Sequence, residues 1–263
     1  MDRRVDLEAA IGERLESRTF GRALECHETL SSTNDRARRW LDEGGPTGLA
    51  VLALHQSSGR GRGRRKWASP SGAGLYVSFG SRVAPSAAHL LALAAGLATH
   101  RAVESLIAKS LELKWPNDLV TRERKKLAGV LIEASSLAGT VDAVIGIGLN
   151  LDPTGRPAEL EGVATSLTEL SPDSRIDLVS AFTKIAAHLE AELEALASPD
   201  GAARLRFEWS RRAFGLGRRA RVTDGAEDVA GIFQGISEDG ALVLSAATGP
   251  RRVYAGDLEL LEP

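Results

Sequence analysis

The segment between Leu54 and Phe79 contains the densest group of chemically useful side chains in the sequence. Eight consecutive positions within it hold three glycines and five cations, namely Gly59, Arg60, Gly61, Arg62, Gly63, Arg64, Arg65 and Lys66. Glycine lets the backbone approach a ligand closely, and arginine presents a planar pair of donors that matches phosphate or carboxylate. The segment therefore predicts an anion-binding loop between two strands. The alternative is a solvated or RNA-binding run of charge, because such runs are common on protein surfaces.

Ser32, Thr33 and Asn34 form a second polar cluster. Ser32 and Asp35 have the spacing of a helix N-cap and its third-position acid, which predicts that a helix begins here. The same cluster offers several hydrogen-bonding groups at a helix N-terminus, which would suit a polar, uncharged ligand. Helix capping and ligand binding are therefore both open interpretations of these side chains.

Three further positions place polar or flexible groups near the ends of apolar strands. Gln56 follows the apolar run 48–54 and can direct its amide into a site. The segment Lys-Trp-Pro-Asn-Asp at 114–118 separates two short strands, and Lys126 stands at the mouth of a third. Partial desolvation there would strengthen the charge interactions of Lys126, although a solvated strand end is the alternative. Gly146 and Gly148, inside the apolar run 141–151, indicate close packing or ligand approach.

The composition is that of an ordinary protein with a substantial core. The 263 residues are 43% hydrophobic and 26% charged, and the net charge of -2 argues against a general nucleic-acid binder. Cys26 is the only cysteine, which excludes an intramolecular disulfide and a cysteine-rich zinc site. The charged N-terminus lacks the apolar region of a signal peptide, and no apolar run is long enough to span a membrane. We therefore expect a reducing, cytoplasmic setting and no membrane partner.

The expected elements arrange these groups around a sheet. Apolar periodicity predicts helices at 5–16, 86–107, 176–196 and 201–214. Apolar runs predict strands at 23–27, 48–54, 75–79, 111–115, 130–133 and 141–151. After Gly215-Leu216-Gly217, short alternating segments at 219–221, 229–233, 241–244 and 252–254 predict a small SH3-like β-barrel. The sequence thus predicts two domains, residues 1–215 and 216–263.

Four segments, taken together and in this order, resemble the biotin–protein ligase family. They are Ser32-Thr33-Asn34, Gln56 to Trp67, Lys114 to Asp118, and Lys126-Leu127-Ala128-Gly129. Gly146 to Asn150 and the expected barrel extend the resemblance to nearly the whole chain. The resemblance implies an α+β fold, with a mixed, mostly antiparallel sheet packed with helices as in class II synthetases. The chain lacks the N-terminal winged helix-turn-helix of repressor-type members, so it resembles the monofunctional type, and no DNA contact is expected.

The resemblance also implies an activity, that of a biotin–[biotin carboxyl-carrier protein] ligase (EC 6.3.4.15). Biotin and Mg²⁺-ATP would form biotinyl-5′-AMP and pyrophosphate, and the biotinyl group would then pass to a lysine of a biotin carboxyl carrier domain. Biotin itself is the nucleophile in the first step, which agrees with the absence of a recognisable Ser-His or Cys-His pair. A lipoate or octanoate–protein ligase is the nearest alternative, and an RNA-binding protein is a more distant one.

The family motifs assign expected roles to particular residues of this chain. Biotin would be held by Ser32, Thr33, Asn34, Gln56, Gly59, Arg60, Gly61, Arg62, Lys126 and Gly129. ATP and the adenylate would contact Arg60, Arg62, Trp67, Asn117 and Lys126. Lys126 and Arg62 are the expected catalytic residues, because the transition state gathers negative charge on phosphate oxygens. Asp118 would orient the acceptor amine or assist Mg²⁺, and no fixed metal site built from protein ligands alone is expected.

The basic loop is also expected to change its order when ligand binds. Its like charges repel one another until an anion neutralises them, and its glycines raise the entropy of the free state. We therefore expect residues 59–66 to be poorly ordered without ligand and to fold over the adenylate once it is bound.

Overall fold

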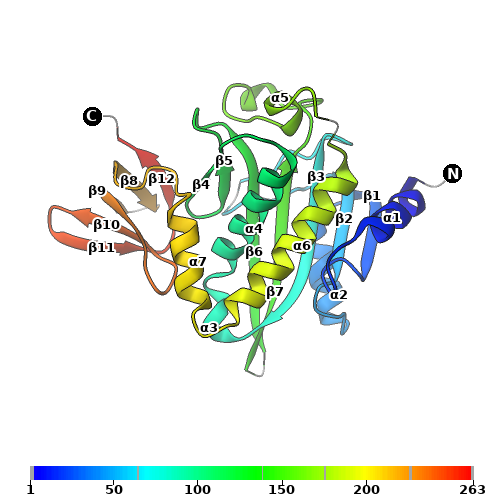
Figure 1. Cartoon of the computed structure of the whole chain (residues 1–263), viewed down its shortest axis with the longest axis horizontal. Coiled ribbons are helices and arrows are strands. Elements are labelled where there is room, and N and C mark those ends of the chain that lie inside the picture. The colour runs from blue at the N-terminus through cyan, green and yellow to red at the C-terminus, as the bar shows by residue number, and fades with distance from the viewer. Residues whose placement is uncertain (1–2, 64, 138, 175, 225–226, 262–263) are drawn as a thin grey trace.

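A seven-stranded sheet runs through the centre of the structure, a computed structural model that describes residues 3–63, 65–137, 139–174, 176–224 and 227–261 (Figure 1). Its strands are β1 (Leu24–Leu30), β2 (Ala50–Gln56), β3 (Gly74–Val83), β4 (Glu112–Lys114), β5 (Asp118–Val120), β6 (Lys126–Leu137) and β7 (Thr140–Asn150). Their order across the sheet is β1-β2-β3-β7-β6-β5-β4. Only β1 and β2 are parallel, and every other neighbouring pair is antiparallel. The expected α+β class with a mixed, mostly antiparallel sheet is therefore confirmed.

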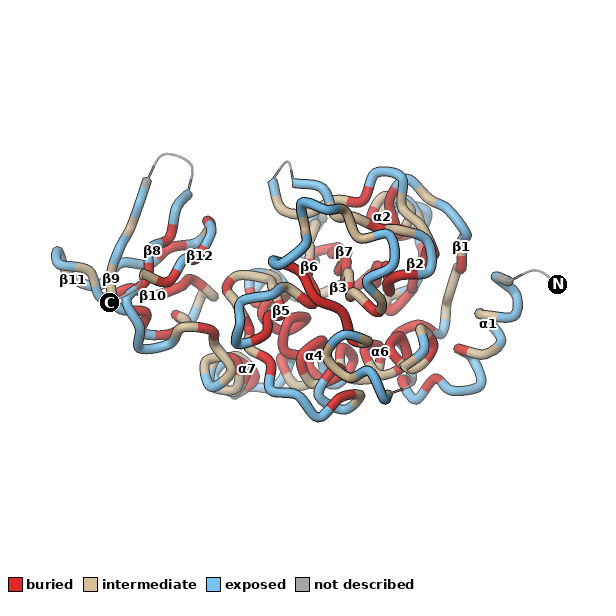
Figure 2. The backbone as a smooth tube through the Cα atoms, turned by 90° about the horizontal axis from the view of Figure 1, so that it is seen from above, coloured by how far each residue is buried: buried red, intermediate tan, exposed pale blue. Residues whose placement is uncertain are grey.

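Helices cover both faces of this sheet. One face is covered by α4 (Leu91–Leu106) and α6 (Leu178–Leu196), with α1 (Arg3–Arg14) and α7 (Gly201–Ser210) beside them (Figures 1 and 2). On the opposite face, α2 (Thr33–Asp42) packs on β2, β3 and β7 over a small apolar cluster. Because α4 packs against the sheet and between its neighbours α6 and α7, it is buried around most of its circumference, as its apolar sequence predicts.

The single helix expected at 86–107 is wrong, because the structure divides it in two. A one-turn helix, α3 (Pro85–Ala88), precedes α4, and the chain bends between them at His89 and Leu90. Proline favours the first turn of a helix, which explains where α3 begins. Leu90, at the bend, is 1% exposed and belongs to the main core. The apolar pattern of the sequence continues across this position, so the pattern could not indicate where the helix is interrupted.

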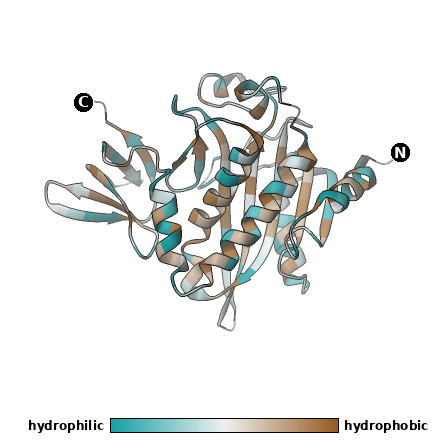
Figure 3. Cartoon of the chain, viewed as in Figure 1, coloured by the Kyte–Doolittle hydropathy of each residue, from teal (hydrophilic) through white to brown (hydrophobic). Residues whose placement is uncertain are grey.

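The two faces of the sheet differ because successive strand residues point to opposite sides. Apolar side chains of β3 and β7 face the helical core, namely Leu75, Val77, Phe79, Ile145, Ile147 and Leu149. The alternate positions on these strands include Ser78, Gly146 and Gly148, which belong to the face that α2 covers. Hydrophobic colour follows the strands and the inner sides of α4 and α6 (Figure 3). Packing on the helical side thus stabilises the strands, while the small residues on the opposite side leave space next to the sheet.

A second, antiparallel sheet follows the last helix. Its strands are β8 (Arg219–Asp224), β9 (Glu227–Ile236), β10 (Leu242–Ala246), β11 (Gly249–Val253) and β12 (Asp257–Leu260), in the order β11-β10-β9-β8-β12. This agrees with the small β structure expected at the C-terminal end, although β12 was not foreseen. Gly225, in a turn position of the expected barrel, lies outside the described residues. The stretch 152–173, where no helix was expected, contains η1 (Ala158–Leu160) and α5 (Leu167–Leu170). None of the described helices is long and apolar enough to cross a membrane.

Candidate active site

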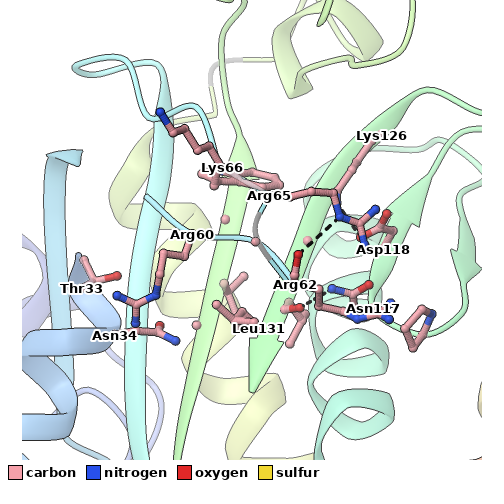
Figure 4. A pocket seen from close by; sticks show the side chains of 18 of the residues that line it. Thr33, Asn34, Arg60, Arg62, Arg65, Lys66, Asn117, Asp118, Lys126 and Leu131 are labelled. Carbon is pink, nitrogen blue, oxygen red and sulfur yellow. Dashed lines mark hydrogen bonds and ion pairs between the residues drawn. The ribbon is translucent and has the colours of Figure 1, made fainter. Parts of the chain in front are cut away.

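A cavity of about 400 Å³ opens beside the small-residue face of the sheet. The N-terminal end of α2, the basic loop, the turn between β4 and β5, and the middle of β6 and β7 surround it (Figure 4). Its cationic lining residues are Arg60, Arg62, Arg65, Lys66, Lys114 and Lys126, against the carboxylates Asp118 and Asp257. This excess of positive charge favours an anionic ligand.

One end of the cavity is built from neutral hydrogen-bonding groups. The Gln56 Oε1 atom accepts from the Thr33 backbone N–H at 2.9 Å and from the Thr33 hydroxyl at 3.1 Å. The hydroxyl of Ser78, which is fully buried, donates to Asn34 Oδ1 at 2.6 Å. Thr33 and Asn34 are themselves 4% exposed. These contacts fix three amide or hydroxyl groups at the opening of a helix, where a polar uncharged ligand group would find both donors and acceptors.

The capping interpretation of Ser32 and Asp35 is wrong for their side chains. Ser32 occupies the N-cap position of α2, with extended backbone angles, but its side chain makes no capping hydrogen bond and the residue lines the cavity. The Asp35 carboxylate instead lies 2.7 Å from Nη1 of Arg60, a partner that comes from the basic loop. An ion pair with an arginine distant in sequence has replaced the local capping interaction.

Two glycines of β7 leave the space that the cavity side chains need. A Cβ atom on Gly146 would lie 2.2 Å from Asn34 Oδ1, and one on Gly148 would lie 2.4 Å from the Trp67 ring. Both separations are far below any real carbon contact, so alanine at either position would displace the neighbouring side chain. The glycines inferred from the apolar run 141–151 therefore serve close approach, and the approaching groups are site residues.

The basic loop has hydrogen bonds of its own. The Trp67 N–H donates to Gly59 O at 2.9 Å, and the Gly61 N–H donates to Arg65 O at 2.8 Å, which closes a narrow turn. Arg60 Nη2 lies 2.9 Å from the carboxylate of Glu133 on β6. Arg64 lies outside the described residues. The change of loop order on ligand binding stays a prediction.

Two arginines of the loop end on the C-terminal sheet. Both terminal nitrogens of Arg62 donate to Gly256 O at 3.2 Å, and Arg65 pairs with the Asp257 carboxylate at 3.0 Å. Burial in the cavity is the main cause that lowers the pKa of the Arg62 guanidinium, while Asp257 acts in the opposite direction. A desolvated guanidinium interacts more strongly with an anion than a fully hydrated one does.

Lys126 is the first residue of β6 and stands between several site groups. Its Nζ lies 2.6 Å from Asp118 Oδ1 and 5.2 Å from the centre of the Trp67 ring. The side chain is 35% exposed, so the ammonium is partly desolvated, as the sequence position suggested. A Cβ atom on Gly129 would lie 3.0 Å from Lys126 Nζ, so glycine there lets the ammonium approach the strand closely. The Trp67 Nε1–H is buried without a hydrogen-bond partner among the described residues.

A second cavity of about 420 Å³ shares part of its wall with the first. The shared residues are Lys66, Trp67, Lys114, Asp118 and Lys126. Much of the remaining wall comes from the stretch between Asn150 and Ala164, including Asp152 and Arg156. Sequence reasoning did not identify this cavity, because the polar residues of its remaining wall lie in a segment without strand or helix periodicity.

Comparison with known proteins assigns the chain to a family. Residues 27–150 match the biotin/lipoate A/B protein ligase family, and residues 215–261 match the biotin protein ligase C terminal domain. A biotin–[acetyl-CoA-carboxylase] ligase of Mycobacterium tuberculosis is 36% identical over 254 residues, which cover 90% of this chain and 88% of the relative. The chain belongs to the biotin protein ligase family.

Other members of the biotin protein ligase family support this assignment over most of the chain. The bifunctional ligase/repressor BirA of Bacillus subtilis is 31% identical over 253 residues, covering 94% of this chain and 76% of the relative. A solved structure of biotin protein ligase from Aquifex aeolicus, in complex with biotin and ATP, superimposes with a TM-score of 0.78 and 27% identity. That superposition covers 92% of this chain and all of the other.

The first cavity brings together most of the residues that the family motifs suggested. These are Ser32, Thr33, Asn34, Gln56, Arg60, Gly61, Arg62, Trp67, Asn117, Asp118, Lys126 and Gly129. Gly59 is not among its lining residues and lies at the base of the loop, where a Cβ atom would be 2.5 Å from Trp67 O. The Asn117 side chain donates to Val130 O at 2.6 Å, so one of its two amide N–H donors already has a partner within the protein.

Sequence reasoning missed several groups that touch the site. Ser78, Glu133 and Asp257 were not singled out, Lys114 was named only as part of the 114–118 motif, and Asp35 was taken only as a capping residue. For Ser78 and Glu133 a signal existed, since each is a polar residue inside an otherwise apolar strand. Asp257 gave no signal, because charged residues are frequent in a short exposed strand. Within the described residues, no cluster of three or more His, Cys, Asp or Glu side chains could hold a metal ion.

Proposed function

We propose that this chain activates biotin as biotinyl-5′-AMP at the expense of ATP and transfers the biotinyl group to a lysine of a biotin carboxyl carrier domain. The observation that carries the proposal is the position of Lys126 in the wall that two cavities share. A carboxylate bound in one cavity and a triphosphate entering from the other would meet at this ammonium. Membership of the biotin protein ligase family and the named relatives support the same reaction.

Biotin would occupy the first cavity with its ring at the neutral end. Biotin carries a ureido group, whose carbonyl and N–H groups match the hydroxyl and amide groups of Ser32, Thr33, Asn34 and Gln56. Its carboxylate would then extend toward Arg62 and Lys126 and the excess of positive charge. Backbone at Gly61 and Gly129, where no side chain intervenes, would let the ligand lie close to the loop and to β6. Gly59 would contribute indirectly, by shaping the base of the loop.

ATP would bind with its nucleoside part in the second cavity and its α-phosphate beside Lys126. Trp67 would form the partition between the two ligands, and Lys66 and Lys114 would supplement the charge around the phosphates. Mg²⁺ would arrive as part of the Mg²⁺-ATP substrate, because phosphate oxygens and water are the ligands that this ion prefers. Asn117, held by the hydrogen bond from its amide to Val130 O, would contribute its second amide N–H to the wall near the phosphates.

The chemistry requires little from the protein beyond position and charge. A biotin carboxylate oxygen attacks the α-phosphorus, the bond to the β-phosphate bridge breaks, and pyrophosphate leaves. Two anions must approach each other, so Lys126 and Arg62 would offset their repulsion and stabilise the charge that builds on the phosphate oxygens. The carrier lysine amine then attacks the carbonyl carbon, AMP leaves, and the amine loses a proton. Asp118, which pairs with Lys126, would orient that amine or assist Mg²⁺.

The nearest alternative is a lipoate or octanoate ligase, and the neutral end of the cavity argues against it. Lipoate and octanoate have no hydrogen-bonding groups at the end remote from the carboxylate, so the remaining hydrogen-bonding capacity of the buried Asn34 and Thr33 side chains would stay unused. The match at 215–261 is also to a domain named for biotin protein ligases. An RNA-binding function has no comparable support, because the loop arginines contact carboxylates and carbonyls of this chain.

The wider setting forms part of the same proposal. The chain would act in the cytoplasm and without contacting DNA, which its net charge of -2 supports. We also propose a domain boundary at 215–216, with the ligase chemistry in residues 1–215 and the C-terminal sheet in residues 216–263. The match that begins at residue 215 supports this division.

The deciding experiment incubates the purified chain with Mg²⁺-ATP and either biotin or lipoate. Pyrophosphate release is followed, and mass spectrometry detects any retained acyl-adenylate. Release with biotin, together with retained biotinyl-5′-AMP, is the expected result, and a biotin carboxyl carrier domain added next should gain the mass of one biotinyl group. Release with lipoate alone would keep the architecture and overturn the substrate. No release with either acid would overturn the proposal.

A further inference from the structure

Glu133 is the one charged residue of β6 beyond Lys126, and it contacts two residues of the cavity wall without lining the cavity itself. Its Oε2 atom accepts from Asn34 Nδ2 at 2.8 Å, and both carboxylate oxygens accept from Arg60 Nη2, at 2.9 and 3.0 Å. A single carboxylate thus joins the first turn of α2 to the basic loop. The Glu133 side chain is 37% exposed, so its charge is only partly desolvated and these partners complete its hydrogen bonding.

The contact with Asn34 determines how the amide of that residue is oriented. The nitrogen end donates to Glu133, and the oxygen end accepts from the buried hydroxyl of Ser78 at 2.6 Å. A carboxylate is an acceptor only, so it can pair with the amide nitrogen but not with the amide oxygen. The amide is therefore fixed with Oδ1 beside Gly146, where one lone pair stays available to a ligand N–H.

The contact with Arg60 holds the beginning of the loop beside the first turn of α2 (Figure 4). Asp35 from α2 and Glu133 from β6 flank the guanidinium at 2.7 and 2.9 Å. Burial alone would lower the pKa of Arg60, but the hydrogen bonds to these two carboxylates outweigh it and the pKa is raised. Two carboxylates already neutralise the charge of Arg60, so this residue is suited to anchoring the loop. Arg62 and Lys126 would then be the residues that bind the ligand anion.

We propose that Glu133 is a positioning residue of the biotin site, which orients the Asn34 amide toward the ureido group and anchors the loop through Arg60. This inference rests on the proposed function, since the ureido group belongs to biotin. It assigns Arg60 a role different from the anion-binding role suggested by its family motif. It also assigns biotin recognition, and not ATP recognition, to an acidic side chain on β6.

The test compares three variants of the full chain with the wild type. Glu133→Gln keeps the shape but loses the charge and places an NH₂ group near other donors. Asp35→Asn weakens the anchor of Arg60 without touching Asn34. Glu194→Gln is the matched control, because that carboxylate also pairs with an arginine, Arg18, but on the surface of α6. For each protein, calorimetry gives the biotin dissociation constant without ATP, pyrophosphate release gives both KM values, and thermal unfolding gives Tm.

Glu133→Gln should raise the biotin dissociation constant and the biotin KM roughly tenfold to a hundredfold, the scale of one lost charge-assisted hydrogen bond. The KM for ATP should stay within about twofold of the wild type, the range of an ordinary surface substitution. Asp35→Asn should raise the biotin KM only about two- to fivefold, because the ion pair that it loses is partly exposed. Glu194→Gln should match the wild type.

A double variant tests whether Glu133 acts through Asn34. In an Asn34→Ala background, Glu133→Gln should add less than about threefold, because neighbouring groups that act together are not additive. Full additivity would overturn the inference, and so would an unchanged biotin dissociation constant in Glu133→Gln. Equal rises in both KM values with a lowered Tm would also overturn it, by showing a structural role alone. If the wild type fails to bind biotin, the proposed function itself fails, which separates the two conclusions.

Discussion

Replacing Lys126 by methionine should slow adenylate formation about 10²–10³-fold, the scale of losing one donor that stabilises a transition-state charge. Methionine has a similar length and apolar character to the lysine stem, so it can still pack beside Trp67, while the ammonium over the ring is lost. The backbone contacts of the residue, from its N–H to Val163 O at 2.8 Å and from the Thr165 N–H to its carbonyl at 2.9 Å, do not depend on the side chain. The fold should therefore survive the change.

The structure separates two contributions to this effect. Loss of the cation removes stabilisation of the phosphate oxygens, worth about 2.7–4 kcal/mol of barrier. The same change leaves Asp118, whose side chain is 22% exposed, without its partner at 2.6 Å, and the free carboxylate would repel the incoming anions. The pair itself is partly exposed and contributes on the order of 1 kcal/mol or less to folding. Activity should thus fall far more than the free energy of unfolding does.

Single-turnover pyrophosphate release, at saturating biotin and Mg²⁺-ATP, measures the effect. Lys184→Met is the matched control, because Lys184 pairs with Glu16 at 2.9 Å on the surface of α6. The double variant Lys126→Met/Asp118→Asn should recover only the part of the rate that is due to carboxylate repulsion. A Lys126→Met rate within about threefold of the wild type, less than 1 kcal/mol of barrier, would refute the reasoning. Full recovery in the double variant would also refute it, because repulsion by Asp118 would then explain the whole loss.

Four other outcomes follow from the geometry. Gly148→Ala would place a methyl group 2.4 Å from the Trp67 ring, so pyrophosphate release should fall by about tenfold or more, and normal turnover would show that the ring can move aside. Arg62→Gly should speed escape of the acyl-adenylate about tenfold, seen as unselective biotinylation of bystander proteins; unchanged selectivity would count against a retaining role. Burial raises the pKa of the Cys26 thiol to about 12, so iodoacetamide should label the folded chain at pH 8 roughly 10³-fold more slowly than the unfolded chain, and equal rates would contradict its burial. Burial also lowers the pKa of His100 below its ordinary value, so the unfolded state binds a proton first as pH falls below about 6.5 and the free energy of unfolding in urea should decrease there. His100→Gln should reduce that decrease, and an identical pH dependence in the variant would assign it to other groups.

Much of the site could be predicted because its residues lie where local patterns are strongest. Lys126 begins an apolar strand, Gln56 ends another, and Thr33 opens a helix, so each could be placed at the boundary of an element. Strand and helix boundaries are where side chains leave the packed interior. The glycines of β7 were visible for a related reason, since glycine inside an apolar strand needs an explanation.

What could not be predicted depends on partners that are distant in the chain. Asp35 has the spacing of a capping residue, yet Arg60 arrives from another segment and takes the carboxylate. Local hydrogen-bonding preference is weaker than a charge-assisted ion pair, and only the fold reveals the competitor. The bend at Leu90 is similar, because apolar periodicity continues across it and the core alone determines where the helix breaks. The contribution of Asp257 could not be inferred at all without knowing which sheet lies beside the loop.

Because the basic loop contacts the C-terminal sheet, the segment that connects the two sheets can influence the position of the loop and, through it, the activity. Arg62 and Arg65 end on Gly256 and Asp257, so the placement of the loop depends on a turn almost two hundred residues further along the chain. An insertion or deletion within residues 215–217 would shift that turn and act on the active site as a loop mutation would. In a chimaera that joins residues 1–215 to the C-terminal sheet of a relative, the basic loop of this chain would meet a turn from another protein and the two would not match. The turn has little latitude of its own, because a Cβ atom on Gly256 would lie 2.7 Å from Thr223 O. A substitution in the turn can therefore alter the loop as directly as a substitution in the loop itself, although almost two hundred residues separate them in the sequence.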